Sequence, residues 1–425
     1  MTKKIDSILK EVLERVEPLK EEMDIIEENL EKFLAKIKKR KKTLRIDADI
    51  FVGGSFAKKT AIKKDAYDVD IFVRFDKKYE EKRISELTKK LLAGVKAVSV
   101  VHGSRDYFRV KINSYFFIEV VPVMKIKNTD EARNITDLSY SHVKYMNKKV
   151  KNKKILEGIK IAKSFCHANN CYGAESYING FSGYGLELLV YYYKNFLKFV
   201  KAISKIKGRE VVDIEKHYRN KSAVLMDLNS SKLQSPIILI DPTHKQRNAL
   251  AALSQETFKK FQRVCRDFLK NPSIKYFEIQ KTDLEKIKKE AGKKNQKFIL
   301  LEAETNKQEG DVAGSKLLKF YRHLETEISK FFGIKKKGFN YNHQQSARYF
   351  FVVKSKKEIL AEGPNIEDKK NVLAFRKKHK KVFVKKKRIY ARKKIDFSLN
   401  EFIEKWKKKN KKQIEEMSIR SLEIH

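Results

Sequence analysis

Cysteine, proline and long apolar runs are scarce in this chain of 425 residues. Three cysteines cannot form a disulfide framework, and the C-x4-C pair has no second pair to complete a zinc site, so we expect three buried thiols (Cys166, Cys171 and Cys265). No segment approaches the roughly 18 apolar residues of a membrane-spanning helix, and the first residues are amphipathic rather than signal-like. These absences predict a cytoplasmic protein without a membrane span.

Acidic residues are also few relative to basic ones. The chain has 97 Lys and Arg against 54 Asp and Glu, which gives a formal net charge of +43. A field of this sign attracts a polyanion, so RNA or DNA is the leading partner and an anionic membrane surface is the alternative. The hydrophobic fraction of 41% excludes wholesale disorder, and the length suits two to four domains.

Apolar residues at helical spacing predict two amphipathic helices between residues 5 and 42, broken near Pro18. A β/α region follows, and residues 106–112 and 115–121 are expected to form a hairpin. Helical patterns dominate residues 152–270, before a small α/β region and a basic segment. The further elements expected are strands over 48–53, 69–75, 275–280, 297–303 and 347–354, and helices over 80–92, 155–168, 185–203, 256–269, 282–291, 315–332 and 399–418.

The most informative stretch is FVGGSFAKKTAIKKDAYDVDIFVRF, in which two expected strands flank a short connection. The first strand ends in Gly53, Gly54 and Ser55, and the second carries Asp68 and Asp70 after twelve residues. Residues i and i+2 of a strand share a face, so the two carboxylates repel each other unless a cation lies between them. Mg²⁺ prefers oxygen ligands, and glycine lets backbone N–H groups approach a triphosphate closely. The stretch therefore predicts a magnesium-dependent nucleotide site.

A third carboxylate on a neighbouring strand would complete a two-metal site for phosphoryl transfer. Glu119 provides one, between two apolar residues of the expected hairpin. D-x-D alone can be an exposed acid pair and G-G-S alone a turn, but their order and spacing together predict catalysis. In such a site Asp68, Asp70 and Glu119 bind the ions that activate the attacking hydroxyl and stabilise the leaving pyrophosphate.

These motifs resemble the signature of the DNA polymerase β nucleotidyltransferase superfamily, hG[GS] followed by Dh[DE]h and a later h[DE]h. Within it the chain is similar to the archaeal (class I) CCA-adding enzymes through IEVVPV, LSYSHVKY, YGAE, GFSGYGLELLV, IDPTHKQRNALAALS and EGPNIEDKKNVLAF. The similarity is strongest up to about residue 255. It implies an α+β multidomain protein with a polymerase β-like nucleotidyltransferase head (1–150), a helical neck completing the nucleotide pocket (151–270), an α/β body (271–318, with 396–425 returning to it) and a basic tRNA-binding tail (319–395).

The resemblance implies template-independent addition of C, C and A to the 3′ end of tRNA, with CTP and ATP as substrates and Mg²⁺ as the cofactor. No membrane partner is expected, and a homodimer is left open. Two alternatives stay open as well. A poly(A) or poly(U) polymerase would use the same three acids without stopping, and a catalytically silent protein of this fold would only bind RNA.

The resemblance also implies which residues contact the incoming nucleotide. Arg247 is expected to read the nucleobase together with the RNA end, because a planar guanidinium can pair with base acceptors. Asp241 and Arg247 could equally form a structural ion pair. The other contacts implied are Gly54, Ser55 and Lys58 at the phosphates, and His142, Lys163 and Tyr172 at the triphosphate or ribose.

Three residues depart from the family's pattern. Glu119 stands where Asp is expected in many relatives, and its extra methylene changes the metal geometry without removing the ligand. Lys58 stands where relatives often have Arg, so a bidentate grip on phosphate becomes a point charge. Asn179 stands where a basic residue is expected, which puts one phosphate contact in doubt.

The basic stretch FRKKHKKVFVKKKRIYARKK (375–394) interleaves apolar residues with cations. Lysine at this density suits contacts with the RNA backbone, which carries most of the recognition of A-form RNA. A solvated charge run is the alternative. If the stretch binds RNA, the affinity should fall steeply with salt.

Overall fold

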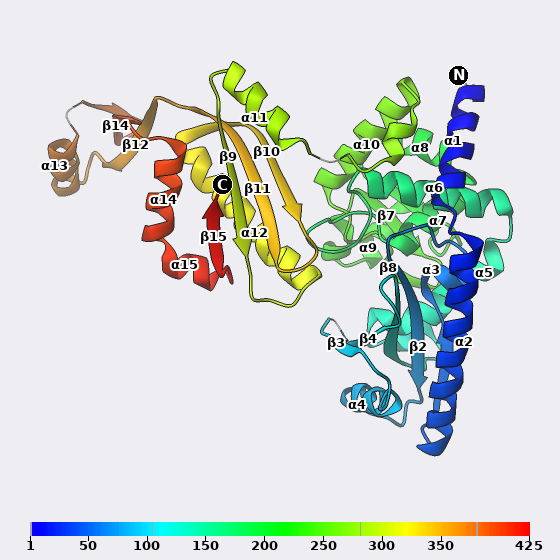
Figure 1. Cartoon of the computed structure of the whole chain (residues 1–425). Helices are drawn as coiled ribbons and strands as arrows, with labels where there is room; N and C mark the ends of the chain where they lie inside the picture. Colours follow the sequence, from blue (N-terminus) through cyan, green and yellow to red (C-terminus); the bar gives the residue numbers. More distant parts are fainter. Residues whose placement is uncertain (1, 104, 281, 380) are drawn as a thin grey trace. The chain divides into compact units, whose positions relative to one another are not determined.

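The computed structural model describes residues 2–103, 105–280, 282–379 and 381–425. The chain divides into two compact units, Met1–Gln280 and Lys281–His425, and Figure 1 labels most of their helices and strands. The first unit contains all of the predicted catalytic and nucleotide-binding residues, from Gly54 to Arg247.

The first unit begins with two helices, α1 (Thr2–Val16) and α2 (Lys20–Thr43), which are separated at Pro18 as predicted. Proline lacks the N–H that would continue a helix, and its ring clashes with the preceding turn. The break lets the two helices join different cores. Val12 of α1 lies among the buried residues of the helical region, whereas Ile37 of α2 lies under the catalytic sheet.

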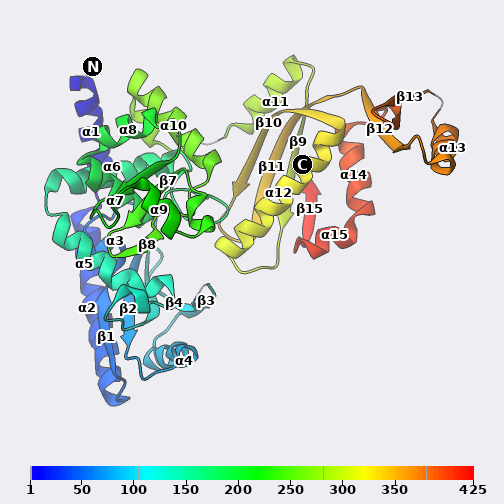
Figure 2. The same ribbon diagram turned by 180° about the vertical axis from the view of Figure 1, so that it is seen from behind.

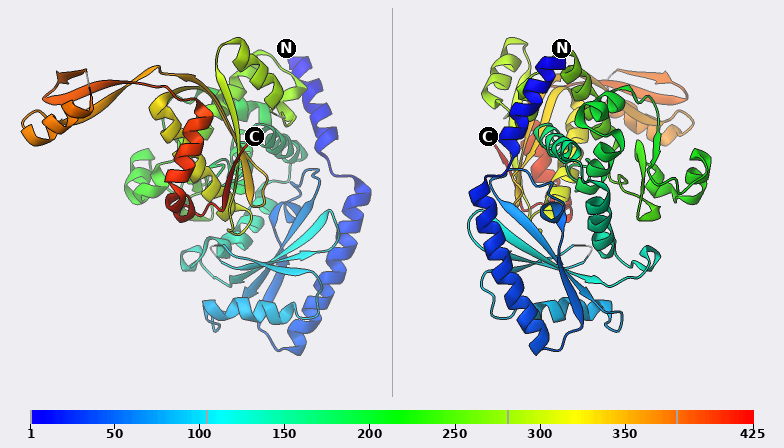
Figure 3. Two further views of the ribbon diagram at one scale, coloured as in Figure 1. Left: turned by 60° about the vertical axis from the view of Figure 1, so that its left-hand side comes forward. Right: turned by 90° about the vertical axis from the view of Figure 1, so that its right-hand side faces the viewer.

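The three predicted catalytic acids lie in a five-stranded sheet of order β1-β2-β5-β4-β3 (Figure 3). β2 and β5 are parallel, and the other neighbours are antiparallel. The β4–β5 hairpin confirms the prediction. β3 was not predicted, because four residues at a largely exposed edge give no clear pattern. The strands are β1 (Ala48–Val52), β2 (Tyr67–Phe75), β3 (Val98–Val101), β4 (Tyr107–Lys111) and β5 (Phe116–Met124).

One face of this sheet is covered by α2 and α4 (Glu81–Leu91). Val69 and Ile71 of β2 belong to the same buried cluster as Phe33 of α2 and Leu87 of α4. Side chains alternate along a strand, so the residues between these apolar positions project from the other face. That second face carries the acids.

A helical region with a small sheet completes the first unit (Figure 2). Its core is rich in aromatic rings, such as the contacting Phe165 and Phe261, and the three cysteines are free and buried within it, as predicted. The elements are α5 (Ser139–Lys149), α6 (Lys153–Ala168), α7 (Gly183–Tyr193), α8 (Phe196–Lys205), β6 (Glu210–Asp213), α9 (Lys221–Asp227), β7 (Ile237–Asp241), β8 (His244–Asn248) and α10 (Gln255–Lys270).

Two predictions for this region are wrong. The helix expected over 185–203 is broken, because Lys194 has a φ of 72° and Asn195 then caps α8. Residues 275–280 form no strand, and a 3-10 turn lies at Ile274–Phe277 instead. The sheet β6-β7-β8 was missed, because a short apolar run such as β7 reads the same as a buried helix segment.

The second unit contains a four-stranded sheet of order β10-β11-β9-β15. Residues 421–424 pair with this sheet through β15 and β9. The structure also moves β10 and β11 from the predicted tail into this sheet, and the helix expected over 399–418 is interrupted at Asn410. The elements are α11 (Leu284–Lys293), β9 (Lys297–Glu304), α12 (Asp311–Phe331), β10 (Phe332–Tyr341), β11 (Ser346–Ser355), α14 (Leu399–Lys409), α15 (Lys411–Glu416) and β15 (Ser421–Ile424).

The basic stretch contributes β13 and β14 to a separate three-stranded sheet of order β12-β14-β13 in the same unit. β12 (Glu358–Asn365) is followed by α13 (Lys369–Lys378), β13 (Val382–Lys385) and β14 (Arg388–Lys394). Among the residues that the structure describes, no helix is both long enough and apolar enough to span a lipid bilayer.

Candidate active site

The pairing of two strands brings two of the predicted acids together. Asp68 and Asp70 project from the face of β2 that α2 and α4 leave open, and Asp70 lies directly opposite Glu119 in the parallel register of β2 and β5. Residues opposite each other in a sheet share a face. The three carboxylates therefore lie on one face of the sheet, as the spacing predicted for Asp68 and Asp70.

The carboxylates perturb one another. The pKa of Asp70 is raised to about 7, mainly by burial and by the negative charge of Glu119. Asp68 adds a weaker effect of the same sign, and the positive charge of Lys58 opposes the shift. Burial also raises the pKa of Glu119, although the Arg109 guanidinium counteracts it. Clustered carboxylates that raise one another's pKa favour a bound cation. Their oxygen atoms are the ligands that a hard divalent ion takes.

Arg109 holds Glu119 in this structure. Its Nε and Nη2 atoms donate to Glu119 Oε1 at 3.0 and 2.6 Å. Within the described ranges, no three His, Cys, Asp or Glu side chains are grouped so that they could surround an ion. Glu119 must leave Arg109, or share its carboxylate, before it can act as the third ligand.

Gly53 and Gly54 connect β1 to the short helix α3 (Gly54–Ala57) beside the acids. The Gly53 N–H donates to the Asp70 carbonyl oxygen at 2.8 Å, and Gly54 has a φ of 62°. A Cβ on Gly54 would lie 1.7 Å from Asp70 Oδ2. Glycine is therefore required here by the packing of the acid itself, a reason that the sequence did not reveal.

Lys58 and Lys163 meet at a carboxylate that was not predicted. Glu187 is fully buried in α7, and its Oε2 accepts from Lys58 Nζ at 2.6 Å while its Oε1 accepts from Lys163 Nζ at 2.8 Å. Burial by itself would raise the pKa of Glu187, but the two ammonium groups lower it to about 2. The available signal was a single acid in the otherwise uncharged helix GYGLELLVYYY.

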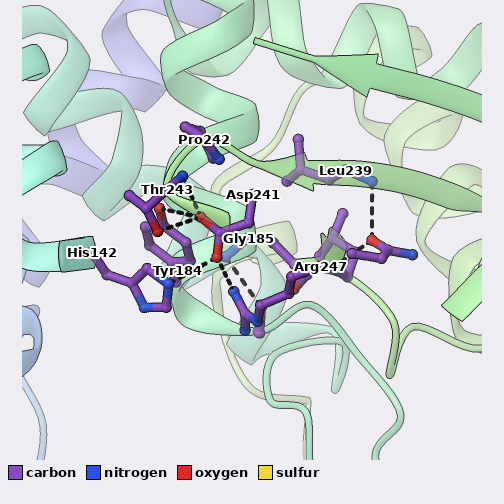
Figure 4. A network of polar contacts seen from close by, with 12 residues as sticks. His142, Tyr184, Gly185, Leu239, Asp241, Pro242, Thr243 and Arg247 are labelled. Carbon is purple, nitrogen blue, oxygen red and sulfur yellow. Dashed lines mark hydrogen bonds and ion pairs between the residues drawn. The ribbon is translucent and has the colours of Figure 1, made fainter. Parts of the chain in front are cut away.

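A second buried carboxylate, Asp241, holds His142 and Arg247 (Figure 4). Its Oδ2 accepts from Arg247 Nη1 at 2.6 Å and lies 2.8 Å from His142 Nε2. Its Oδ1 accepts from the hydroxyl of Tyr184 at 3.2 Å and the backbone N–H of Thr243 at 2.9 Å. Burial opposes ionisation of Asp241, but His142 and Arg247 keep its pKa below the ordinary value. The ion pair considered from the sequence is therefore present.

The ring of Tyr184 lies among the predicted nucleotide contacts, although it was not predicted itself. His142 stacks on it with ring centroids 4.0 Å apart, and the Arg247 guanidinium and Lys58 Nζ lie 5.9 and 6.0 Å from its centroid. Burial lowers the pKa of His142, against the opposing effect of the Asp241 carboxylate. Lys58 and Arg247 bring two further cations to the same ring.

Tyr172 lies beside the start of α7. Burial, with smaller effects of Glu187 and Asp70, raises the pKa of its hydroxyl. Its ring stacks on His167 at 4.0 Å, and its backbone forms an isolated bridge with Phe181. A Cβ on Gly183 would lie 2.8 Å from the Tyr172 hydroxyl, so this glycine makes room for the tyrosine at the start of α7.

The departure at Asn179 has a local cause. Its φ of 49° is in the left-handed region, where asparagine is tolerated better than lysine or arginine. Its N–H donates to Glu175 O at 2.7 Å, and its own carbonyl accepts from Ser254 N at 3.0 Å. Asn179 thus closes a turn.

Two family models match consecutive parts of the first unit. The model described as Second Messenger Oligonucleotide or Dinucleotide Synthetase domain matches residues 3–155. The model described as tRNA nucleotidyltransferase, second domain, matches residues 157–278. Their junction lies close to the boundary expected between head and neck.

Similar proteins come from archaea. The CCA-adding enzyme of Nanoarchaeum equitans is 33% identical over 338 residues, which cover 79% of this chain and 81% of that protein. The CCA-adding enzyme of Methanocaldococcus jannaschii is 29% identical over 405 residues, which cover 91% and 87%.

Solved structures share the fold at low identity. A cytoplasmic RNA terminal U-transferase has a TM-score of 0.51 at 14% identity, over 66% of this chain and 100% of that one. A poly(U) polymerase has a TM-score of 0.51 at 13% identity, over 64% and 98%. Identities this low show only the fold, and they confirm the predicted polymerase β-like nucleotidyltransferase architecture.

Proposed function

The chain belongs to the CCA-adding enzymes, and from this premise we propose how its own residues add C, C and A to the 3′ end of tRNA. The observation that carries the assignment is the register of β2 and β5. It sets Asp70 opposite Glu119 on the open face of the sheet. The backbone N–H of Gly53 donates to the Asp70 carbonyl oxygen and so brings the glycine turn next to Asp70.

Asp68, Asp70 and Glu119 are proposed to hold Mg²⁺. A divalent cation would relieve the repulsion by which Glu119 and Asp68 raise the pKa of Asp70. When bound, such ions lower the pKa of the attacking hydroxyl and neutralise charge on the departing pyrophosphate.

The reaction joins the 3′ oxygen of the RNA to the α-phosphorus of CTP or ATP. The bond from that phosphorus to the bridging oxygen of the β-phosphate breaks, and pyrophosphate leaves. In such transfers a protein contributes mainly position and electrostatic stabilisation. Ser55 and the backbone of Gly54 are proposed to donate to the phosphates from beside Asp70, and Lys58 to supply positive charge.

Base selection is proposed to need no nucleic-acid template. Arg247 presents a guanidinium that Asp241 anchors through one nitrogen, which leaves its remaining N–H groups for base acceptors and the RNA end. His142 and Tyr184 stack beside it and can limit the space for the base. Tyr172 is proposed to contact the ribose.

The test is extension of a tRNA lacking its CCA end, with labelled CTP and ATP and Mg²⁺, resolved at single-nucleotide length. Growth by three nucleotides that requires both triphosphates is expected. Asp70→Asn should lower the rate by at least about 100-fold without loss of tRNA binding. Asp49→Asn is the matched control, because Asp49 is an exposed acid on β1 of the same sheet.

Other products would overturn the proposal. Long tails from one triphosphate would indicate a poly(A) or poly(U) polymerase, and RNA binding without extension would indicate a silent RNA-binding protein. Light scattering on the same preparation tests the homodimer. Use of tRNA also agrees with the cytoplasmic location that the sequence predicts.

A further inference from the structure

Glu187 is a buried acid for which the reaction proposed above has no role. It lies in the helical region, yet two of its partners, Lys58 and Thr60, come from the catalytic region that contains α3. Lys58 Nζ donates to Oε2 at 2.6 Å, and Thr60 Oγ1 and Lys163 Nζ donate to Oε1 at 2.7 and 2.8 Å. A buried carboxylate is retained only when its partners compensate for lost hydration, and here they are two cations and a hydroxyl.

All three N–H groups of Lys163 donate to acceptors within this network. A lysine ammonium has three N–H groups, and those of Lys163 reach Thr60 O at 3.0 Å, Thr60 Oγ1 at 2.9 Å and Glu187 Oε1 at 2.8 Å. The side chain is 4% exposed. A phosphate oxygen could bind Lys163 only by displacing one of these protein acceptors.

Lys58, in contrast to Lys163, keeps N–H groups available for a ligand. Among the described residues its Nζ has one acceptor, Glu187 Oε2, so two of its three N–H groups are left for a ligand. Its ammonium lowers the pKa of Asp70 on one side and of His142 on the other, and it lies 6.0 Å from the Tyr184 ring centroid. This placement is between the acids and the Asp241 cluster, where a triphosphate must lie if both act on one nucleotide.

We infer that Glu187 is a positioning residue that fixes the Lys58 ammonium against the phosphates of the incoming nucleotide, with Lys163 and Thr60 holding the carboxylate. Lysine carries a point charge on a flexible stem, so an anchor is needed to define where that charge lies. The inference rests on the proposed function, in which Lys58 binds phosphate.

The experiment measures the KM for CTP and kcat with a CCA-lacking tRNA for Glu187→Gln, Lys58→Met and the double variant. Glu187→Gln keeps the size of the side chain and removes its charge. It should raise the KM by roughly tenfold and change kcat by less than about threefold. In the Lys58→Met background the same change should alter the KM by less than about twofold, because Glu187 then has nothing to position.

Asp137→Asn is the matched structural control. Asp137 is a fully buried carboxylate paired with Arg105, away from the acids of β2 and β5. Its loss should lower the urea midpoint of unfolding and leave the KM for CTP within about twofold. If Glu187→Gln does not fold, Glu187→Asp keeps the charge but withdraws it by one methylene, and it should raise the KM by roughly threefold to fivefold.

An unchanged KM in the Glu187 variant that folds, or an equal rise with and without Lys58, would overturn the inference. So would Lys58→Met with a normal KM. Failure of the proposed function looks different, because the wild-type protein itself would then not add three nucleotides.

Discussion

Arg109 and Glu119 face each other across β4 and β5, and two nitrogens of the guanidinium donate to one carboxylate oxygen. Glu119 in turn lies opposite Asp70, so a cation and two acids form a row across three strands. Arg109 neutralises Glu119 in the place of a metal ion. If Glu119 is a metal ligand, as proposed above, the metal ion competes with Arg109 for its carboxylate.

Arg109→Gln should lower the Mg²⁺ concentration for half-maximal addition by roughly threefold to tenfold, because the metal no longer competes with the guanidinium. A titration of the addition rate against Mg²⁺ at saturating CTP and ATP measures this. Arg74→Gln, on the same face of β2 but over the Tyr140 ring, is the control and should leave the titration midpoint in place. An unchanged or higher Mg²⁺ requirement in Arg109→Gln would remove Glu119 from the ligand set.

Asp241→Asn should lower both stability and base selectivity. The substitution removes the negative charge of a buried ionic cluster and leaves its positive charge uncompensated, which lowers the free energy of unfolding by about 3 kcal/mol. Arg247 also loses the contact that orients its guanidinium. Urea unfolding measures the first effect, and the ratio of CTP to UTP incorporation measures the second. Thr243→Val removes only one donor to Asp241 and should change stability by about 1 kcal/mol. Full selectivity in Asp241→Asn would show that Arg247 needs no anchor.

The acids could be predicted because their signal is local. Strand alternation puts Asp68 and Asp70 on one face, and the apolar bracket around Glu119 marks a neighbouring strand. The parallel pairing of β2 and β5 depends on the crossover through α4 and two further strands, which local patterns do not specify. The order of the sheet was therefore not predicted.

The two buried anchors could not be predicted in the same way. Glu187 and Lys58 are separated by 129 positions in the chain, and Asp241 and His142 by 99. The residues around Glu187 and Asp241 do not indicate which distant residue each carboxylate binds. An acid inside an apolar helix shows that some partner exists, because an unpaired buried charge is too costly to keep.

Lys163 predicts a pH dependence of stability. Burial lowers its pKa to about 8 despite the attraction of Glu187, whereas an unfolded lysine has a pKa of 10.5. Between these values the unfolded state binds more protons than the folded state, so the contribution of Lys163 to stability increases as pH rises from 8 to 10.5, by roughly 3 kcal/mol. Below pH 8 both states are protonated and this contribution is constant.

Urea unfolding of the wild type and Lys163→Met at pH 7.5 and pH 10 measures the effect. Other lysines and tyrosines titrate in both proteins, so the difference between the two isolates Lys163. The wild type should gain stability relative to the variant between the two pH values. A constant difference would mean that the Lys163 ammonium keeps an ordinary pKa.

Lys386 and Lys387 form the two-residue turn between β13 and β14, with φ values of 50° and 61°. Two positive φ values define a type I′ hairpin turn, for which Asn-Gly is strongly preferred. Lysine at both positions is unfavourable for folding, since each left-handed residue costs about 1 kcal/mol. We predict that this turn contacts RNA, because a basic hairpin tip suits the phosphate backbone.

Lys386→Asn combined with Lys387→Gly should therefore stabilise the protein by about 1 kcal/mol and weaken its binding to tRNA. If both ammonium groups contact phosphates, the slope of log affinity against log salt becomes less steep by roughly 1 to 2. Filter binding across a salt series measures the slope. Lys288→Gln with Lys289→Gln removes the same charge from exposed positions of α11 and separates contact from net charge. An equal loss of tRNA affinity in the two double variants would contradict a direct contact of the lysine turn with RNA. The loss would then come from the lower net charge alone, because a direct contact must add to that effect.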